Sequence, residues 1–372
     1  MKRVSLFFVL CTLCLCTCKA APKLVYYGDT LDWNTDWKRT QCGTLDIKKN
    51  IVEVSGIACS RVTPGFIWMQ SDEREDRIIA TDEKGEKPAC ILNMTDTIGW
   101  DWEDMSGGVY EGKNYLFIGS FGDNNEKRKD YRIIYFEEPA IDSVNMPVQS
   151  VKPNYIKYVY PDGKSHNNEA LMYDNREQMI YIITKVYYNV CQVFSIPFRL
   201  DYGKEVQTLT YVCDLGLQSD IGMGNYEGKQ LAYRGFHLVT GADISPDGKY
   251  ILIKNHNNLV ASFTWTLLFT RLDGESVAET LKREHHPAPL KCYSYEWQGE
   301  AICWLNDSTF YTTSDADDGN PPIFKYTKKA PQGIETVQTD NNRNANHLVF
   351  INNTLYIRSK ENLYTLDGRR VQ

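Results

Sequence analysis

Apolar, β-rich runs recur along the chain in sets of three, separated by polar turn residues. In each set, a short segment that combines a small or acidic residue with apolar residues comes first, a strongly apolar run follows, and a third run alternates apolar and polar residues. The first segments are 54–58, 102–105, 168–172, 241–245 and 299–302. The second runs are 66–69, 115–118, 180–183, 250–253 and 309–312, and the third are 77–80, 131–135, 191–195, 261–265 and 322–326. Alternation with a high content of β-branched and aromatic residues is typical of antiparallel strands.

The repetition itself predicts the fold. Three antiparallel strands with a more variable fourth, repeated along the chain, describe the blades of a β-propeller. We therefore expect an all-β protein, a five- or six-bladed β-propeller of four-stranded antiparallel blades, because a β-sandwich would not produce this recurrence. The longer spacings leave room for a sixth unit around 208–212. We expect equivalent inner-strand positions for Ile57, Met105, Leu171, Ile244 and Ile302.

The first residues have the pattern of an export signal. Lys2 and Arg3 precede an apolar run over 4–16, and Cys18-Lys19-Ala20 forms a small-x-small cleavage site. The predicted organisation is a signal peptide at 1–20, the propeller at 21–335, and C-terminal strands at 336–372. We expect a secreted or cell-surface protein. The alternatives are a periplasmic location and a lipid anchor at Cys18, because residues 15–18 resemble a loose lipobox.

The last residues form two strand-like runs at 353–358 and 363–371, with an Asp-Gly turn in the second. They resemble the short C-terminal tail of bacterial type IX secretion cargo, which implies a bacterial exported protein. The alternatives are two ordinary strands around a turn and strands that close a blade.

Composition narrows the classes of partner. The net charge of −7 provides no basic face, so we expect no nucleic-acid partner. No later apolar run reaches the ~18 residues that a membrane helix needs, so we expect no transmembrane helix in the mature chain. We expect a monomer. Of the 11 cysteines, those after residue 20 show no Cys-x-x-Cys spacing, and we expect most of them to be buried free thiols.

Acidic and polar residues recur at two places in each unit, where the first strand starts and where the second strand ends. In an up-and-down blade these two places lie at the same end of the channel. Binding at this mouth is predicted for a set that also includes nearby polar loop residues: Glu103, Asp104, Asp123, Asn124, Arg128, His166, Glu169, Lys185, Asp243, Lys254, Glu300 and Asp315. Asp72 also follows a second strand.

Gathered carboxylates repel one another unless a cation or hydrogen bonds offset the repulsion. Lys185 and Lys254 can do so in part, and a bound metal, with Ca²⁺ as the candidate, can do the rest. The predicted metal ligands are Glu103, Glu169, Asp243 and Glu300. The alternative is that these acids accept hydrogen bonds from backbone amides of the neighbouring blade. His166 is either an acid–base group near Glu169 or a packed side chain.

Five segments together carry a family resemblance: 101–104, 122–125, 166–171, 243–248 and 299–301. They resemble bacterial secreted β-propellers that are similar to the esterase-like phytase and NHL/WD40-like groups. The resemblance implies the propeller fold, and it implies no particular activity.

Two functions fit these residues. The first is a binding propeller whose acidic mouth takes a small molecule, a glycan or a protein, with or without a divalent cation. The alternative is a metal-dependent hydrolase that acts on phosphate esters or glycosides through paired carboxylates. The sequence contains no Gly-x-Ser-x-Gly, His-Glu-x-x-His or P-loop motif. Whether the protein is an enzyme, and which residues would be catalytic, stays open at this point.

Overall fold

The computed structural model divides into two compact units, Met1–Thr327 and Lys328–Gln372. It describes residues 29–30, 37–45, 53–96, 100–186, 191–215, 222–226, 229–233, 237–257, 264–283, 296–315, 320–329, 347–351, 354–359, 362–365 and 369–371. The predicted signal peptide and the Asp-Gly turn of the C-terminal tail lie outside these residues. The domain boundaries drawn from the sequence stay a prediction.

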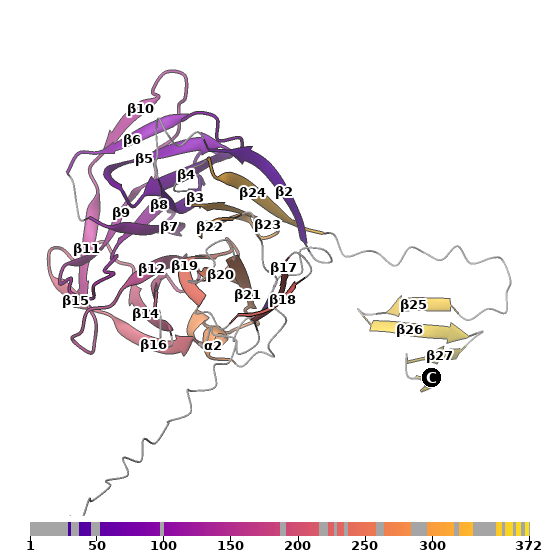
Figure 1. Ribbon diagram of the computed structural model, residues 1–372. Helices are drawn as coiled ribbons and strands as arrows, with labels where there is room; N and C mark the ends of the chain where they lie inside the picture. Colours follow the sequence, from indigo (N-terminus) through magenta and orange to yellow (C-terminus); the bar gives the residue numbers. More distant parts are fainter. Residues whose placement is uncertain are drawn as a thin grey trace, which may run out of the picture. The chain divides into compact units, whose positions relative to one another are not determined.

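The first unit is a ring of five sheets, as Figure 1 shows. The inner strand of each sheet contacts the inner strands of the two neighbouring sheets, and the last contacts the first, so the ring is closed. The inner strands are β3 (Val54–Cys59), β7 (Trp102–Tyr110), β12 (Asn168–Asp174), β19 (His237–Ile244) and β22 (Gly299–Asn306). The predicted all-β propeller is confirmed, with five blades of four or five strands.

Each of the first two blades adds a parallel fifth strand to four antiparallel ones. From the centre outward, blade one holds β3, β4 (Phe66–Ser71), β5 (Arg74–Asp82), β6 (Cys90–Met94) and β10 (Val148–Val151). Blade two holds β7, β8 (Lys113–Ser120), β9 (Tyr131–Glu137), β11 (Asn154–Val159) and β15 (Val206–Thr208). Each of these outer strands belongs in sequence to the next blade, since β10 lies between β9 and β11 and β15 lies between β14 and β16.

Blade three consists of β12, β13 (Met179–Thr184), β14 (Cys191–Pro197) and β16 (Thr210–Leu215). The segment around 208–212, which left room for a sixth blade, is therefore divided between the outer strands of blades two and three.

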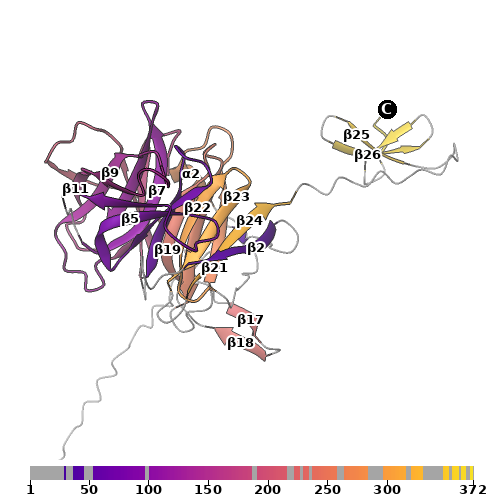
Figure 2. The same ribbon diagram turned by 90° about the horizontal axis from the view of Figure 1, so that it is seen from above.

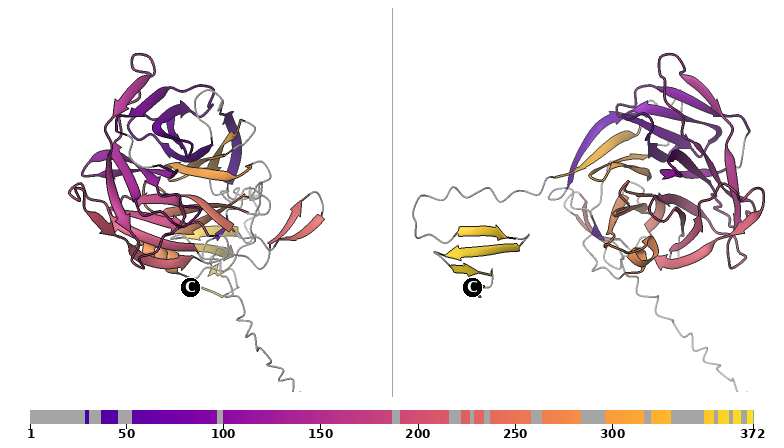
Figure 3. Two further views of the ribbon diagram at one scale, coloured as in Figure 1. Left: turned by 60° about the vertical axis from the view of Figure 1, so that its left-hand side comes forward. Right: turned by 180° about the vertical axis from the view of Figure 1, so that it is seen from behind.

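The N-terminal strands complete the last two blades. Blade four holds β19, β20 (Tyr250–Asn257), β21 (Thr264–Thr270) and, at its outer edge, β1 (Asp29–Thr30). Blade five holds β22, β23 (Thr309–Ser314), β24 (Pro322–Lys328) and, at its outer edge, β2 (Trp37–Thr44). Figure 3 shows from behind how the indigo β2 joins the orange strands of blade five. The start of the chain thus pairs with its last blade.

Three small elements lie outside the blades. The hairpin of β17 (Gly222–Tyr226) and β18 (Lys229–Tyr233) forms a sheet of its own and projects from the ring in Figure 2. The short helix α2 (Val277–Lys282) begins with a capping box formed by Ser276 and Glu279. In the second unit, β25 (His347–Ile351), β26 (Thr354–Ser359) and β27 (Asn362–Tyr364) form one antiparallel sheet. The helix within the described residues is too short to cross a membrane.

The hydrophobic core is divided into five clusters, and each cluster fills the space between two neighbouring blades. Ile57, Met105, Leu171, Ile244 and Ile302 are all buried inner-strand residues, and each belongs to a different cluster. Burial of these apolar side chains from both blades is what holds the sheets face to face. The blades approach so closely that a Cβ at Gly56 would lie 2.5 Å from the amide nitrogen of Met105.

A β-bulge near the start of every inner strand sets the register of the blades. Ile57 pairs with Met69 of the second strand, two residues before the pair that precedes the bulge. Met105, Leu171 and Ile302 occupy the same position in their own blades. In blade four that position is occupied by Ala242, opposite Ile253, and Ile244 lies two residues further along β19. Ile244 therefore lies near the predicted position but two residues beyond it, because a shift of two residues along a strand leaves the alternation of apolar and polar residues unchanged.

Candidate functional site

Three glutamates stand at the bulges of the inner strands. Glu103, Glu169 and Glu300 occupy the bulge positions of β7, β12 and β22, and all three are buried. Burial is the largest cause that raises the pKa of Glu103 well above its usual range, and the charge of Glu169 adds to the rise. Burial likewise raises the pKa of Glu300. The three carboxyls from blades two, three and five thus share one electrostatic environment.

Lys185 supplies a cation to this group. It follows β13, and its Nζ lies 2.8 Å from Oε1 of Glu169. Burial alone would lower the pKa of Lys185, but the charges of Glu169, Glu300 and Glu103 outweigh burial and raise it. Its ammonium therefore stays charged in the folded protein and faces all three glutamates.

Two aspartates at the ends of second strands complete the group. Asp72 follows β4, and burial raises its pKa to about 8, with further repulsion from Glu53, Asp315 and Glu169. Asp315 follows β23 and accepts a hydrogen bond of 2.6 Å from Nε2 of Gln298. We call the whole group the acidic mouth: Glu103, Glu169, Glu300, Asp72, Asp315 and Lys185.

A close backbone approach shapes this site on the side of blade two. Oε1 of Glu103 lies only 2.0 Å from where a Cβ of Gly122 would be, so a larger residue at 122 would displace the glutamate. This contact accounts for the glycine of the sequence motif 122–125, because a residue without a side chain leaves room for the Glu103 carboxyl.

Lys254 has a different partner from the one that the sequence suggested. Its Nζ is hydrogen-bonded to Oε2 of Glu296 and lies 3.3 Å from the carbonyl oxygen of Thr313. Glu296 in turn accepts a 2.6 Å hydrogen bond from the hydroxyl of Tyr326. His256 lies near both lysines, and burial followed by their charges lowers its pKa to about 3. Lys254 is thus engaged by a carboxylate that sequence analysis missed, because Glu296 precedes its strand instead of standing at the bulge.

Asp104 and Asp243 accept hydrogen bonds from backbone amides of neighbouring blades. Oδ2 of Asp104 accepts hydrogen bonds from the amide nitrogens of Leu171 (2.8 Å) and Ala242 (3.1 Å), so one carboxyl joins the inner strands of blades two, three and four. Asp243 accepts from the amide of Trp304 at 2.7 Å and from the Ser106 hydroxyl at 3.1 Å. The alternative given for these acids, acceptance from backbone amides of neighbouring blades, describes both residues.

Asp243 also stands apart from the glutamates along its strand. The bulge position of β19 is occupied by Thr240, and Asp243 lies three residues further on. Burial raises the pKa of Asp243 to about 6. It is therefore not equivalent to Glu103, Glu169 and Glu300.

Four further predicted residues lie in two loops, one between β8 and β9 of blade two and one that leads from β11 to blade three. Asp123 accepts hydrogen bonds from the amides of Lys127 and Arg128, both at 2.8 Å, and from the hydroxyl of Tyr131 at 2.7 Å. The guanidinium of Arg128 donates to the carbonyl oxygen of Trp100 and lies over its ring, 4.2 Å from the centroid. These contacts account for Asp123 and Arg128 without a ligand.

Asn124 and His166 continue the same loop network. Asn124 accepts a 3.1 Å hydrogen bond from Nδ2 of Asn167. Nε2 of His166 lies 3.1 Å from Asp162, and its ring packs against Tyr160 at a centroid distance of 4.5 Å. His166 therefore contacts Asp162 and aromatic neighbours, which fits the packing role that was one of its two alternatives.

The calcium site predicted from Glu103, Glu169, Asp243 and Glu300 stays a prediction. Among the described residues, no three His, Cys, Asp or Glu side chains come together as metal ligands do. Asp243 is engaged elsewhere, and the Lys185 ammonium bonds to Glu169.

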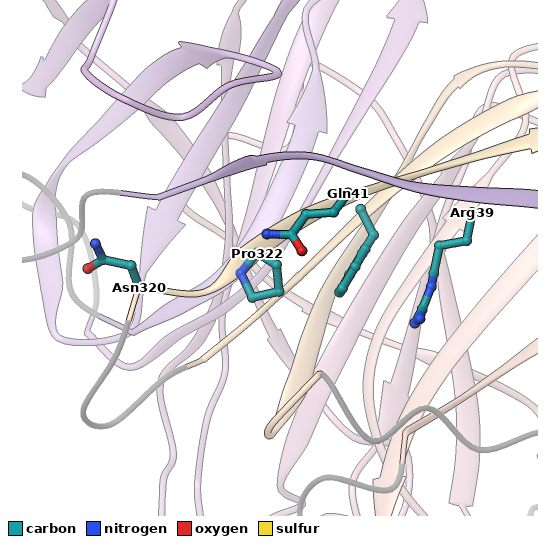
Figure 4. A pocket seen from close by; sticks show the side chains of 5 residues that line it. Arg39, Gln41, Asn320 and Pro322 are labelled. Atoms are coloured by element: carbon teal, nitrogen blue, oxygen red, sulfur yellow. The ribbon is translucent and has the colours of Figure 1, made fainter.

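A hollow lies on the outer strands of blade five. It has a volume of about 570 Å³ and lies between β2 and β24, where Figure 4 shows Arg39, Gln41, Asn320 and Pro322 around it. The guanidinium of Arg39 lies 4.6 Å from the ring centroid of Phe324. Sequence analysis did not single out these residues, because they belong to outer strands and carry no repeat signal.

Comparison with known proteins adds little about function. No family profile matches the chain. No curated protein matches it either. A PQQ-bound aldose sugar dehydrogenase from Streptomyces coelicolor aligns over 79% of this chain and 98% of its own, with a TM-score of 0.38 and 8% identity. A protein of unknown function from Bacteroides thetaiotaomicron aligns over 79% of this chain and 76% of its own, with a TM-score of 0.37 and 11% identity. At this level of similarity, neither protein indicates what this chain binds.

Proposed function

We propose that this protein is an exported binding propeller whose acidic mouth takes the positively charged group of a ligand. The observation that carries the proposal is the imbalance of charge. Among the described residues, five carboxyls share the mouth with the ammonium of Lys185, and burial raises the pKa of Glu103, Glu300 and Asp72. Burial and mutual repulsion disfavour the ionised form of these carboxyls. A bound cation that replaces their protons would stabilise that ionised form.

The chemistry of the ligand follows from that imbalance. An amine of a sugar or a peptide, or a divalent ion bridging to a neutral or anionic ligand, satisfies the mouth. A bare phosphate ester would be repelled by the carboxylates. Because the paired acids lack a ready metal-binding arrangement, the binding function is better supported than the metal-dependent hydrolase.

Thermal unfolding in the presence of matched probes tests this proposal. Glucosamine carries a charged amine, whereas N-acetylglucosamine offers the same sugar ring without the charge, and calcium chloride tests the divalent route against sodium chloride of equal ionic strength. A ligand at a hundredfold excess over its Kd stabilises the native state by about 2.7 kcal/mol. This corresponds to a rise in melting temperature of several degrees.

Two variants show whether the rise in melting temperature comes from the mouth or from carboxyls elsewhere on the surface. Glu103→Gln combined with Glu300→Gln removes two mouth carboxyls and should abolish the rise. Glu137→Gln removes an exposed carboxyl that pairs with Lys113 on the outside of blade two, and it should leave the rise intact. If glucosamine, calcium, magnesium and manganese all leave the melting temperature of the unmodified protein unchanged, the proposed function is wrong.

A further inference from the structure

The ring has a seam where the first inner strand meets the last. β3 and β22 are neighbours in space, although Cys59 and Cys303, which they carry, are 244 residues apart in the sequence. The outer edge of this closure is made by β2, which joins the sheet of blade five. At the inner edge, blades five and one are held by the hydrophobic cluster that includes Ile57, Ala301 and both cysteines.

The two thiols point at each other across this seam. Their sulfur atoms are 3.3 Å apart, and both residues are buried, with exposed fractions of 6% for Cys59 and 1% for Cys303. A disulfide has an S–S bond of about 2.05 Å, so the sulfurs need to approach by only a little over 1 Å. Both cysteines are free thiols in this structure.

We propose that Cys59 and Cys303 form a disulfide that closes the propeller between blades one and five. The oxidant is a disulfide-bearing molecule, such as oxidised glutathione or an oxidoreductase of the exported compartment. One cysteine thiolate attacks the oxidant, forms a mixed disulfide and releases one thiol, and the second cysteine thiolate then attacks the mixed disulfide and releases the other. The two cysteines lose two protons and two electrons, and the disulfide of the oxidant is reduced to two thiols.

The burial of the pair indicates when the bond forms. Burial raises the pKa of the Cys303 thiol well above its usual range, which makes the thiolate scarce once the ring is closed. Oxidation is therefore expected during folding, as β22 docks against β3, and the finished bond is shielded from reductants. A cross-link that closes so long a loop strongly reduces the conformational entropy of the unfolded chain. It therefore raises the stability of the folded protein considerably.

Peptide mapping of the whole chain tests the bond directly. The protein is refolded with a mixture of oxidised and reduced glutathione, its remaining thiols are alkylated, and it is digested without reduction. We expect the peptide with Cys59 to be linked to the peptide with Cys303, while Cys90, a fully buried thiol of β6, is alkylated after denaturation. If both Cys59 and Cys303 are recovered as alkylated monomers under these conditions, the proposal is wrong.

Thermal unfolding with and without dithiothreitol gives a second measurement. Protein that is unfolded and refolded in dithiothreitol, so that the pair is never oxidised, should melt roughly 5 °C or more below protein refolded with glutathione. The double variant Cys59→Ala with Cys303→Ala should show the same melting temperature in both conditions, and Cys90→Ala should keep the response of the unmodified protein. An oxidised protein that melts at or below the temperature of the reduced protein would overturn the inference. These outcomes do not depend on whether the acidic mouth binds a cation.

Discussion

Asp72→Asn is the substitution whose effect follows most directly from the electrostatics of the mouth. Asp72 stands at the end of β4, partly buried, and burial together with Glu53, Asp315 and Glu169 raises its pKa to about 8 from the usual 3.8. The asparagine has nearly the same size and cannot ionise. It therefore removes the repulsion while leaving the shape of the site almost unchanged.

The sign and size of the effect can be worked out from this shift. Between about pH 4 and pH 8, the folded protein keeps a proton on Asp72 that the unfolded chain releases, so the contribution of Asp72 to stability falls as the pH rises through this window. A shift of about four pKa units corresponds at most to roughly 6 kcal/mol. Contact of Asp72 with solvent and sharing of the proton with neighbouring carboxyls reduce this, and we expect about 2–3 kcal/mol.

Urea unfolding at a series of pH values measures this difference. Near pH 4 the unmodified protein and Asp72→Asn should be about equally stable, and near pH 8 the variant should be the more stable by about 2–3 kcal/mol. Asp273→Asn, in an exposed turn after β21, is the matched control and should follow the unmodified protein throughout. A constant difference between Asp72→Asn and the unmodified protein across the whole range would refute the electrostatic account of the mouth.

Three other predictions concern the lysine of the mouth, the carboxyl that joins the blades, and export. Lys185→Gln leaves the buried Glu169 without its cation and should cost about 3–5 kcal/mol near pH 8 and less near pH 4, measured by the same urea unfolding. Asp104→Ala leaves the amides of Leu171 and Ala242 without their acceptor and should cost about 2–4 kcal/mol, while Asp104→Asn should cost less, as calorimetric unfolding would show. Cell fractionation should find the protein outside the cytosol, and full-length unprocessed chain in the cytosol would contradict the predicted signal peptide.

The fold was predictable because its pattern is repeated. A period of three strands with turns between them is visible in the residues themselves, and each inner strand was located within a few positions. The register of blade four was predicted two residues off, because a shift of two residues along a strand leaves the alternation of apolar and polar residues unchanged. Asp243 and Ile244 were therefore assigned to positions that Thr240 and Ala242 occupy.

The candidate site was predictable only where topology decides it. Strand starts and returning strand ends meet at one end of a blade, and in the structure Glu103, Glu169, Glu300 and Lys185 act on one another electrostatically. Hydrogen-bond partners depend on side-chain geometry, and no repeat signal reveals them. Lys254 thus proved to pair with Glu296, and Asp104 proved to bond to backbone amides.

The exchange of protons for a cation at the acidic mouth is the central claim, and a direct measurement of proton release tests it. Calcium chloride or methylammonium chloride is added to the unbuffered protein near pH 7, and the change in pH is compared with that caused by sodium chloride at equal ionic strength. We predict that one or both of the test cations releases protons from the unmodified protein, and that Glu103→Gln with Glu300→Gln and Asp72→Asn reduces the release sharply. If neither cation releases more protons than sodium does, the mouth does not exchange protons for a cation and the account is contradicted.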